Sequence, residues 1–308
     1  MSTQLSFVTL DVFTSTRYTG NPLAIVKVPQ SEALSQSQKQ RIAREFNLSE
    51  TVFLHEQTQK DREDESVRID IFTALSEVPF AGHPTVGTAN YLLRLLKDAP
   101  LNKVKALQAK AGRFALSINP SIAGGGVQIA VAHNVHLHDS PFAESSFGKH
   151  PVFSIVQGMT FILPQLPDLD SLGSEARNLL DASETYTSYK RLDEGWREGL
   201  IGSYFYVDQG KSSEGVRNLR TRMFASREDP ATGSAASALT SYLSLQEGNP
   251  GRYTYKIVQG VEMGQKSEIF VEIGVREGNG GVEIEEVLLS GSALQVMQGT
   301  LEVPSSDA

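Results

Sequence analysis

Two short segments of the chain combine residues that could bind a small anion. The first is Gly82-His83-Pro84, which follows a strand-like run and precedes small and apolar residues at helical spacing. Proline is favoured at the first position of a helix, because its missing N–H has no partner there in any case. The free N–H groups at such a helix start can bind a carboxylate or a phosphate. An ordinary strand-to-helix turn would use the same residues, so this segment alone fits either interpretation.

The second segment, from Pro230 to Leu239, repeats the pattern of the first. In both, a strand-like run leads through a turn to small residues and then to an apolar helix. Two similar halves would each wrap a sheet around one mostly buried helix, and the two helix starts could face each other across a cleft. Two converging helix N-termini attract an anion more strongly than one does. The repeat therefore predicts a shared anion site.

A third group of residues carries donor atoms that can bind a metal ion. Its members are His133, His136, His138 and Asp139. If the segment is a strand, His136 and His138 lie on one face and His133 lies on the other. A solvated strand end would account for these residues equally well, and the sequence offers no second ligand cluster. A metal-dependent hydrolase is thus an alternative, but the interpretation we prefer has no metal.

Strands dominate the elements that must position these residues. Helices are expected only over 35–46, from 84 to near 96–97, over 169–180 and after Pro230. Without a regular alternation of strands and helices, the pattern favours an α+β fold with curled, mostly antiparallel sheets. Asn119-Pro120 marks a break. We predict one domain over 1–118 with a C-terminal strand at about 294–308, and a second domain over 119–293.

The composition is that of an ordinary soluble globular protein. The chain has 308 residues, of which 40% are hydrophobic and 21% charged. A net charge of −8 with scattered Lys and Arg argues against nucleic acid or an anionic membrane as the main partner. The chain contains neither a bilayer-spanning apolar run nor a signal-peptide pattern, so a cytoplasmic protein is expected. It contains no cysteine, which excludes disulfides, thiolate nucleophiles and cysteine-bound zinc.

Several motifs spread over most of the chain resemble the PhzF family of phenazine biosynthesis-like isomerases, which share the fold of diaminopimelate epimerase. In the family's order, the motifs are Leu10–Phe13 with Gly20–Pro22, Ser49–Phe53, Glu77–Ala89 and Glu228–Ala235. The resemblance implies two similar domains, each a curled sheet or barrel around a central helix, with the active site in the cleft between them. It also implies homodimers and no cofactor.

The resemblance assigns roles to particular residues. Glu50 matches the family's catalytic base, and His83 and Asp229 match the other polar residues of its site. The positions whose backbone groups hold the substrate carboxylate are matched by Gly82, Gly233 and Ser234. The epimerase relatives use a pair of cysteines, which this chain lacks, so a two-thiol mechanism is excluded. From the residues alone, Glu50 could be a solvated strand-start glutamate, His83 a turn histidine and Asp229 a helix cap.

A glutamate is chemically suited to a single-base proton shuttle. It can deprotonate a carbon next to a carbonyl or conjugated carboxylate and return the proton to another carbon. Such a base needs a pKa near the working pH, so we expect Glu50 to be partly buried beside Val52 and Phe53. The sequence thus predicts a cofactor-independent isomerase of a small carboxylate, similar to dihydro-hydroxyanthranilate isomerase. A non-catalytic binding protein of the same fold is a further alternative, although it would have no need of a base.

Two positions depart from the family pattern. Ala74 stands where proline is common, and Gly264-Gln265-Lys266-Ser267 stands where Gly-Arg-Pro-Ser is common. The Gln265-Lys266 departure is placed where it can alter the wall of the cleft. The identity of the substrate is therefore not carried over from the family.

Overall fold

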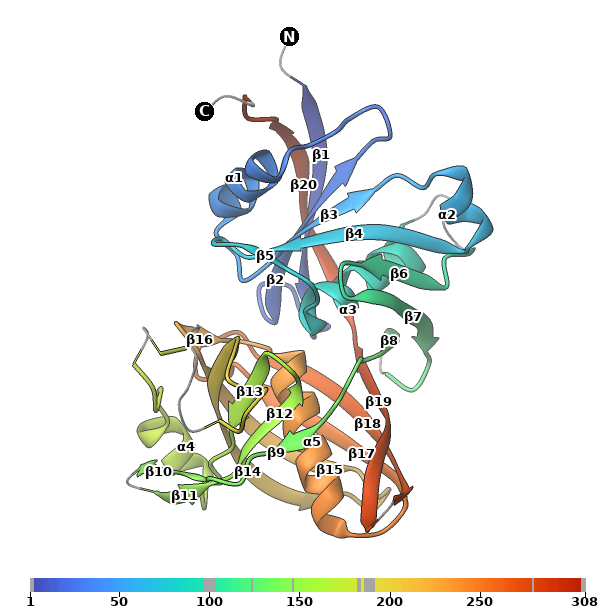
Figure 1. Ribbon diagram of the computed structural model, residues 1–308. Helices are drawn as coiled ribbons and strands as arrows, with labels where there is room; N and C mark the ends of the chain where they lie inside the picture. Colours follow the sequence, from blue (N-terminus) through green and yellow to red (C-terminus); the bar gives the residue numbers. More distant parts are fainter. Residues whose placement is uncertain are drawn as a thin grey trace. The chain divides into compact units, whose positions relative to one another are not determined.

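The computed structural model describes residues 3–96, 103–122, 124–145, 147–181, 184–185, 192–278 and 280–305. The chain divides into two compact units, which we call the first unit (1–130 with 290–308) and the second unit (131–289). Both ends of the chain belong to the first unit, where β1 and β20 run side by side (Figure 1). None of the helices in the described part of the chain is long and apolar enough to cross a membrane.

The first unit is a curled sheet around helix α3 (Figure 1). Its strands are β1 (Gln4–Val12), β2 (Asn21–Val28), β3 (Thr51–His55), β4 (Ser66–Phe72), β5 (Glu77–Val78), β6 (Ala106–Ala109), β7 (Gly112–Asn119), β8 (Gly126–Ala130) and β20 (Ala293–Glu302). Its helices are α1 (Gln36–Phe46), α2 (Gln59–Glu63), α3 (Gly82–Asn90) and the π-helical turn η1 (Tyr91–Leu95). Strands β2 and β3, and likewise β4 and β6, pair in parallel, and the other pairs along the sheet are antiparallel.

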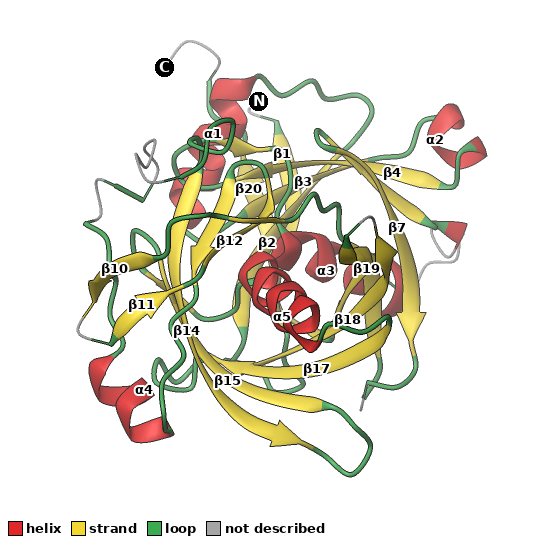
Figure 2. Cartoon of the chain, turned by 60° about the horizontal axis from the view of Figure 1, so that its bottom comes forward, coloured by secondary structure: helices red, strands yellow, loops and turns green. Residues whose placement is uncertain are grey.

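The second unit repeats this plan around helix α5, which strands surround in Figure 2. Its strands are β9 (His136–Leu137), β10 (Phe142–Ser145), β11 (Gly148–His150), β12 (Val152–Val156), β13 (Met159–Ile162), β14 (Leu200–Lys211), β15 (Arg217–Phe224), β16 (Glu228–Asp229), β17 (Gly251–Gln259), β18 (Ser267–Gly278) and β19 (Gly281–Gly291). Its helices are α4 (Leu169–Glu175) and α5 (Gly233–Glu247). Strands β13 and β14, and likewise β15 and β17, pair in parallel, whereas β12–β13, β14–β15, β15–β16 and β17–β18 are antiparallel.

The order and direction of pairing are the same in the two units. From β1 to β7, the strands of the first unit correspond to β12 to β18 of the second, and α3 corresponds to α5. The correspondence extends to residues, because Glu77 and Glu228 hold the same register position ahead of the two helices. The internal repeat predicted from the two helix starts is therefore confirmed.

Small residues allow the two central helices to lie inside their sheets. All of α3 is buried, and a Cβ added to Gly87 would run into the side chain of Leu23. Buried hydroxyls on these helices bond to the carbonyl one turn earlier, as Thr88 does to Pro84 and Thr240 does to Ala236 (2.8 Å each). These two hydroxyls are thus satisfied within their own helices, as most buried polar groups are, whereas the buried hydroxyl of Ser241 in α5 has no hydrogen-bond partner among the described residues.

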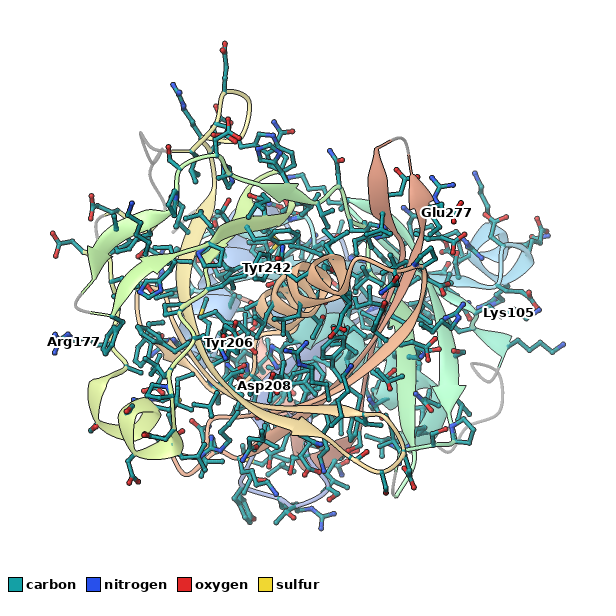
Figure 3. All side chains as sticks on the ribbon, turned by 90° about the horizontal axis from the view of Figure 1, so that it is seen from below. Lys105, Arg177, Tyr206, Asp208, Tyr242 and Glu277 are labelled. Atoms are coloured by element: carbon teal, nitrogen blue, oxygen red, sulfur yellow. The ribbon has the colours of Figure 1, made fainter. Side chains whose placement is uncertain are left out.

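Charged residues fix the far end of α5 to the sheet. Arg217 contacts the carboxylates of Asp208 at 2.6 Å and of Glu247 at 3.2 Å. In Figure 3, Asp208 and Tyr206 lie beside the helix that carries Tyr242. This arrangement places the ion pairs at the C-terminal end of α5 and leaves its N-terminal end for other partners.

The limits of the two units differ from the domain limits predicted at 118 and 294. The first unit continues to Ala130 because β8 forms an antiparallel pair with β7. It resumes at Ser290, since the Phe13 N–H donates to the carbonyl of Ser292 at 2.8 Å. Both differences arise from pairing between segments that the composition around Asn119-Pro120 does not reveal.

Two of the predicted helices have different ends in the structure. The helix expected from Pro84 begins at Gly82 and passes into η1, and its expected end falls partly on Lys97, which lies outside the described residues. The helix expected over 169–180 ends at Glu175. Its later apolar positions belong to a non-helical segment, in which the Leu179 N–H donates to Ser203 Oγ at 3.0 Å.

Candidate active site

In the first unit, Glu50 and His83 form a hydrogen-bonded pair. His83 lies in the first turn of α3 and Glu50 directly precedes β3. The Nδ1 atom of His83 is 2.8 Å from Oε2 of Glu50, and its Nε2 atom is 3.2 Å from the carbonyl oxygen of Asn21. The parallel pairing of β2 with β3 brings Asn21 beside Glu50, and Ser49 Oγ donates to the Asn21 side chain at 3.0 Å.

Burial fits a proton-transfer role for this pair. His83 is 3% exposed, whereas 19% of the Glu50 side chain remains accessible. Val52 and Phe53, which follow Glu50, are fully buried. The partial burial expected of Glu50 is thus confirmed, and its carboxylate can reach both His83 and a ligand.

The contact with Asn21 fixes the tautomer of His83. A backbone carbonyl can only accept a hydrogen bond, so Nε2 of His83 must carry a proton. The contact between Nδ1 and Glu50 then contains one further proton, which belongs either to an imidazolium beside a carboxylate or to a carboxylic acid beside a neutral imidazole. Glu50 and His83 therefore share one exchangeable proton.

The two central helices lack the side-chain caps of the other described helices. The N-caps of α1, α2 and α4 are Ser35, Thr58 and Asp168, and each accepts a hydrogen bond from the backbone of its own first turn. Among the described α-helices, only α3 and α5 begin at residues whose side chains make no such bond, Ala81 and Thr232. Their first N–H groups can therefore be satisfied by an anion.

The second unit brings Asp229, Gly233 and Ser234 into one turn. Asp229 ends β16, and the hydroxyl of Thr232 donates to its Oδ2 atom at 2.5 Å. Ser234 is 6% exposed, and the carbonyl of Gly233 accepts the Ser237 hydroxyl at 2.8 Å. Gly82, Glu50 and His83 are likewise together in the first unit, so each unit holds one half of the predicted set.

Sequence reasoning missed three residues that support these half-sites. Asn21 lies in a quoted motif but received no role, and Thr232 stands between two assigned glycine and aspartate positions. Gln259 gave no signal at all, because a glutamine at a strand end reads as a surface residue. In the structure it is fully buried and contacts both Asp229 and Thr232.

The Gln265-Lys266 departure lies in the turn between β17 and β18. Gly260 begins this turn with a φ of +73°, and a Cβ there would meet Gln265 O at 2.6 Å and Pro230 O at 2.7 Å. The Lys266 side chain is exposed and pairs with Glu268 at 3.4 Å. The backbone carbonyls of Gln265 and Pro230 thus both pack closely against Gly260.

The histidines considered as metal ligands assemble differently from the predicted cluster. His136 and His138 do share a face, with ring centroids 4.8 Å apart, but the acid beside them is Asp193. The ring of His133 instead bonds to the carbonyl of Val131 at 3.0 Å. Asp139 contributes its backbone N–H, which donates to Asp193 at 3.2 Å.

Hydrogen bonds occupy the donor atoms of this cluster. Nδ1 of His138 accepts the Asp193 N–H at 3.1 Å, and its Nε2 atom is 3.0 Å from Ser154 Oγ. His136 bonds to Asp193 Oδ2 at 2.6 Å and stacks on Trp196 at 4.6 Å. Burial and the neighbouring His136 lower the pKa of His138 to about 4. The arrangement favours a hydrogen-bonded structural cluster over a metal-dependent hydrolase site.

Comparisons with known proteins identify relatives over nearly the whole chain. The family model described as phenazine biosynthesis-like protein, PhzC-PhzF, matches residues 10–141 and 196–299. An uncharacterized isomerase of Mesorhizobium japonicum is 31% identical, and the match covers 96% of this chain and 98% of that relative. Trans-2,3-dihydro-3-hydroxyanthranilate isomerase of Pseudomonas fluorescens is 28% identical over 96% of this chain and 99% of its own.

Solved structures share the fold. A PhzF-family phenazine biosynthesis protein of Bacillus anthracis has a TM-score of 0.72 at 18% identity, covering 97% of this chain and 99% of its own. A hydroxyproline epimerase of Agrobacterium vitis, with bound trans-4-hydroxy-L-proline, has a TM-score of 0.62 at 13% identity, covering 99% of this chain and 95% of its own. The predicted epimerase-like α+β fold of two similar domains is confirmed. The chain belongs to the PhzC-PhzF family of phenazine biosynthesis-like proteins, and it is an isomerase.

Proposed function

We propose that this isomerase moves a proton between two carbons of a small carboxylate substrate, without a cofactor, and that Glu50 is its acid and base. The observation that carries the proposal is the single proton shared by Glu50 and His83 beside the uncapped start of α3. The names of the relatives support the substrate class, since several are trans-2,3-dihydro-3-hydroxyanthranilate isomerases.

The proposed reaction begins with the imidazolium form of His83 beside the Glu50 carboxylate. Oε2 of Glu50 contacts His83, so Oε1 takes the proton from the substrate carbon. The electrons of the broken C–H bond pass into the conjugated carboxylate or carbonyl group of the substrate. Glu50 then returns the proton to a second carbon, and His83 keeps the carboxylate oriented throughout.

The repeat supports a mechanism with one base. By strand register, Thr51 corresponds to Ser203, so the position equivalent to Glu50 is Gly202. A Cβ at Gly202 would meet the Met223 side chain at 2.7 Å and the carbonyl of Phe224 at 3.3 Å. The second unit therefore has a closely packed glycine, and no acid, at the equivalent position.

We further propose that the N–H groups at the starts of α3 and α5 hold the carboxylate of one substrate. Gly82 supplies such a group in the first unit, and Gly233 and Ser234 supply them in the second. Asp229 would accept a hydrogen bond from an amine or hydroxyl of the same molecule. We also propose that the enzyme is a homodimer, which sedimentation of the purified protein measures.

The decisive experiment replaces Glu50 by glutamine, which keeps its size but removes the base. Conversion of trans-2,3-dihydro-3-hydroxyanthranilate, and of other small conjugated carboxylates, is followed by NMR. Turnover should fall by about 10²- to 10⁴-fold. Glu45→Gln, on the exposed side of α1, is the matched control and should keep wild-type turnover. A Glu50→Gln enzyme as active as the wild type would refute the proposal.

An isotope experiment tests the single-base step separately. When one base removes and returns the proton, product formed in D₂O retains part of the substrate's own hydrogen at the new position. Two bases would give complete deuteration, because the incoming proton would come from the second group. Retention of any substrate hydrogen at the new position would therefore exclude a two-base transfer and support the role given to Glu50.

A further inference from the structure

A buried network of hydrogen bonds lies behind Asp229 in the second unit. Gln259, the last residue of β17, is at its centre and is fully buried. Its Nε2 atom donates to the Asp229 carbonyl at 2.7 Å and to Thr232 Oγ1 at 3.2 Å. Its Oε1 atom accepts the Tyr204 hydroxyl at 3.1 Å and the Thr232 N–H at 3.4 Å. The side-chain amide of Gln259 thus uses both of its ends.

The partners determine which way the amide of Gln259 points. The Asp229 carbonyl can only accept and the Thr232 N–H can only donate, so the nitrogen must face Asp229 and the oxygen must face the Thr232 backbone. Tyr204 supports this orientation from behind. Burial raises the pKa of Tyr204, so its hydroxyl keeps its proton and remains a donor.

The network also gives the Thr232 hydroxyl a direction. Since Thr232 Oγ1 accepts a hydrogen from Gln259, its own proton is directed to the other partner, Oδ2 of Asp229 at 2.5 Å. A chain of directional hydrogen bonds therefore runs from Gln259 through Thr232 to the Asp229 carboxylate. It holds that carboxylate in one orientation and favours its ionised form.

The first unit builds the same turn without any of these groups. The strand registers and the aligned turns pair Tyr204, Asp229, Thr232 and Gln259 with four apolar residues, Val52, Val78, Ala81 and Ala109. Unlike apolar side chains, buried polar groups carry a desolvation cost that their hydrogen bonds only partly offset. The first unit forms the same fold with apolar residues at all four positions. Folding alone therefore does not account for the polar network of the second unit.

We propose that Gln259 is a positioning residue of this isomerase, with Tyr204 as its support. It holds the turn from Asp229 to Thr232 and directs the Thr232 proton to the Asp229 carboxylate. The inference rests on the proposed role of Asp229 toward the substrate. Gly260 assists by allowing the chain after Gln259 to turn closely against Pro230.

The first test needs no substrate. In protein labelled with ¹³C at the aspartate carboxyl carbons, the Asp229 signal is assigned by its loss in Asp229→Asn. Gln259→Met and Thr232→Val should each displace this signal, and the double variant should displace it by less than the sum, because Gln259 acts largely through Thr232. Ser244→Ala removes another buried hydrogen bond of α5, to Tyr255 at 2.8 Å, and should leave the signal in place.

Two results would overturn the inference. The Asp229 signal could remain in place in Gln259→Met, or the two displacements could simply add. Thermal unfolding of Gln259→Met and Ser244→Ala shows whether both variants are folded. If Gln259→Met fails to fold, Tyr204→Phe replaces it, because it removes only the hydroxyl that supports the Gln259 oxygen.

Turnover separates this inference from the proposed function. On the small conjugated carboxylate that the wild type converts, Gln259→Met should lower kcat/KM by up to about 100-fold, with little further loss when combined with Asp229→Asn. If Asp229→Asn is as active as the wild type, the role proposed for Asp229 fails. If Asp229→Asn is impaired while Gln259→Met is not, only the positioning role of Gln259 fails.

Discussion

Acidification should destabilise the second unit by protonating His138. This imidazole is buried, with Nδ1 bonded to the Asp193 N–H and Nε2 3.0 Å from Ser154 Oγ. Burial and the nearby His136 lower its pKa from 6.5 to about 4. A protonated His138 would place a second donor against the Asp193 N–H, so the folded state resists the proton that the unfolded chain binds readily.

The size of this effect follows from the two pKa values of His138. The pKa of His138 is 6.5 in the unfolded chain and about 4 in the folded protein. At pH values between these two, the unfolded state binds one more proton than the folded state. The free energy of unfolding then falls by about 1.4 kcal/mol for each pH unit of acidification. Over this window, the loss is about 3 kcal/mol. The contribution of His138 is fully present above pH 6.5 and is gone by pH 4.

The assay uses Trp196, the single tryptophan of the chain, which stacks on His136 beside the titrating group. Its fluorescence reports urea unfolding of the second unit at each pH from 7.5 to about 4. His138→Asn keeps an acceptor for the Asp193 N–H but cannot titrate. Its stability at pH 7 should be lower than that of the wild type, and its pH dependence should be shallower by about 3 kcal/mol.

Two outcomes would refute the reasoning on His138. An equal pH dependence in His138→Asn and the wild type would mean that His138 is not held neutral. Added zinc that stabilises the wild type but not His138→Asn would mean that the cluster binds metal. The matched control is His133→Asn, because the ring of His133 bonds to the backbone carbonyl of Val131 and not to the cluster. This variant should keep the wild-type pH dependence.

Three further predictions concern stability. Burial opposes ionisation of Asp70, but hydrogen bonds from His55 and Lys39 outweigh it and lower its pKa to about 2. Asp70→Asn should therefore cost about 2 kcal/mol at pH 7 in urea unfolding, a difference that disappears as the pH falls from about 4 to 2. Gly87→Ala should cost about 1–3 kcal/mol, because its Cβ would meet Leu23, and an unchanged thermal midpoint would contradict the close packing of α3. Ser35→Ala should cost about 1 kcal/mol in urea unfolding by removing the N-cap of α1, whereas Ser35→Thr should retain most of it.

The parts of the fold that could be predicted from the sequence rest on local signals. Gly82-His83-Pro84 predicts the start of a helix, because proline and small residues restrict the backbone conformation of that segment whatever surrounds it. The repeat was visible because both central helices must be made of small residues to fit inside their sheets. The end of α4 could not be predicted, since the apolar periodicity over 169–180 continues past Glu175 while the chain itself leaves the helix.

The parts of the site that could not be predicted depend on partners distant in the sequence. Gln259 meets Asp229 and Tyr204, which are 30 and 55 residues away, and none of the three has a local pattern that points to the others. Asp193 is likewise 57 residues from His136. The sequence alone therefore groups the histidines with Asp139, the acid nearest to them along the chain. Contacts of this kind depend on strand pairing, which brings residues distant in the sequence together.

The comparison of the two units separates what the fold requires from what the chemistry requires. Both units need a strand, a turn and a helix of small residues, and both have Glu, Pro and Gly at the same places in that segment, as Glu77 and Glu228 illustrate. They differ where a substrate would be handled. The first unit has an acid where the second has the crowded Gly202, and the second has a polar network where the first has apolar residues. A chemically symmetric pair of half-sites would suit a symmetric exchange of protons between two faces of one carbon. The asymmetry found in this chain instead suits a mechanism with a single base, carried by the first unit.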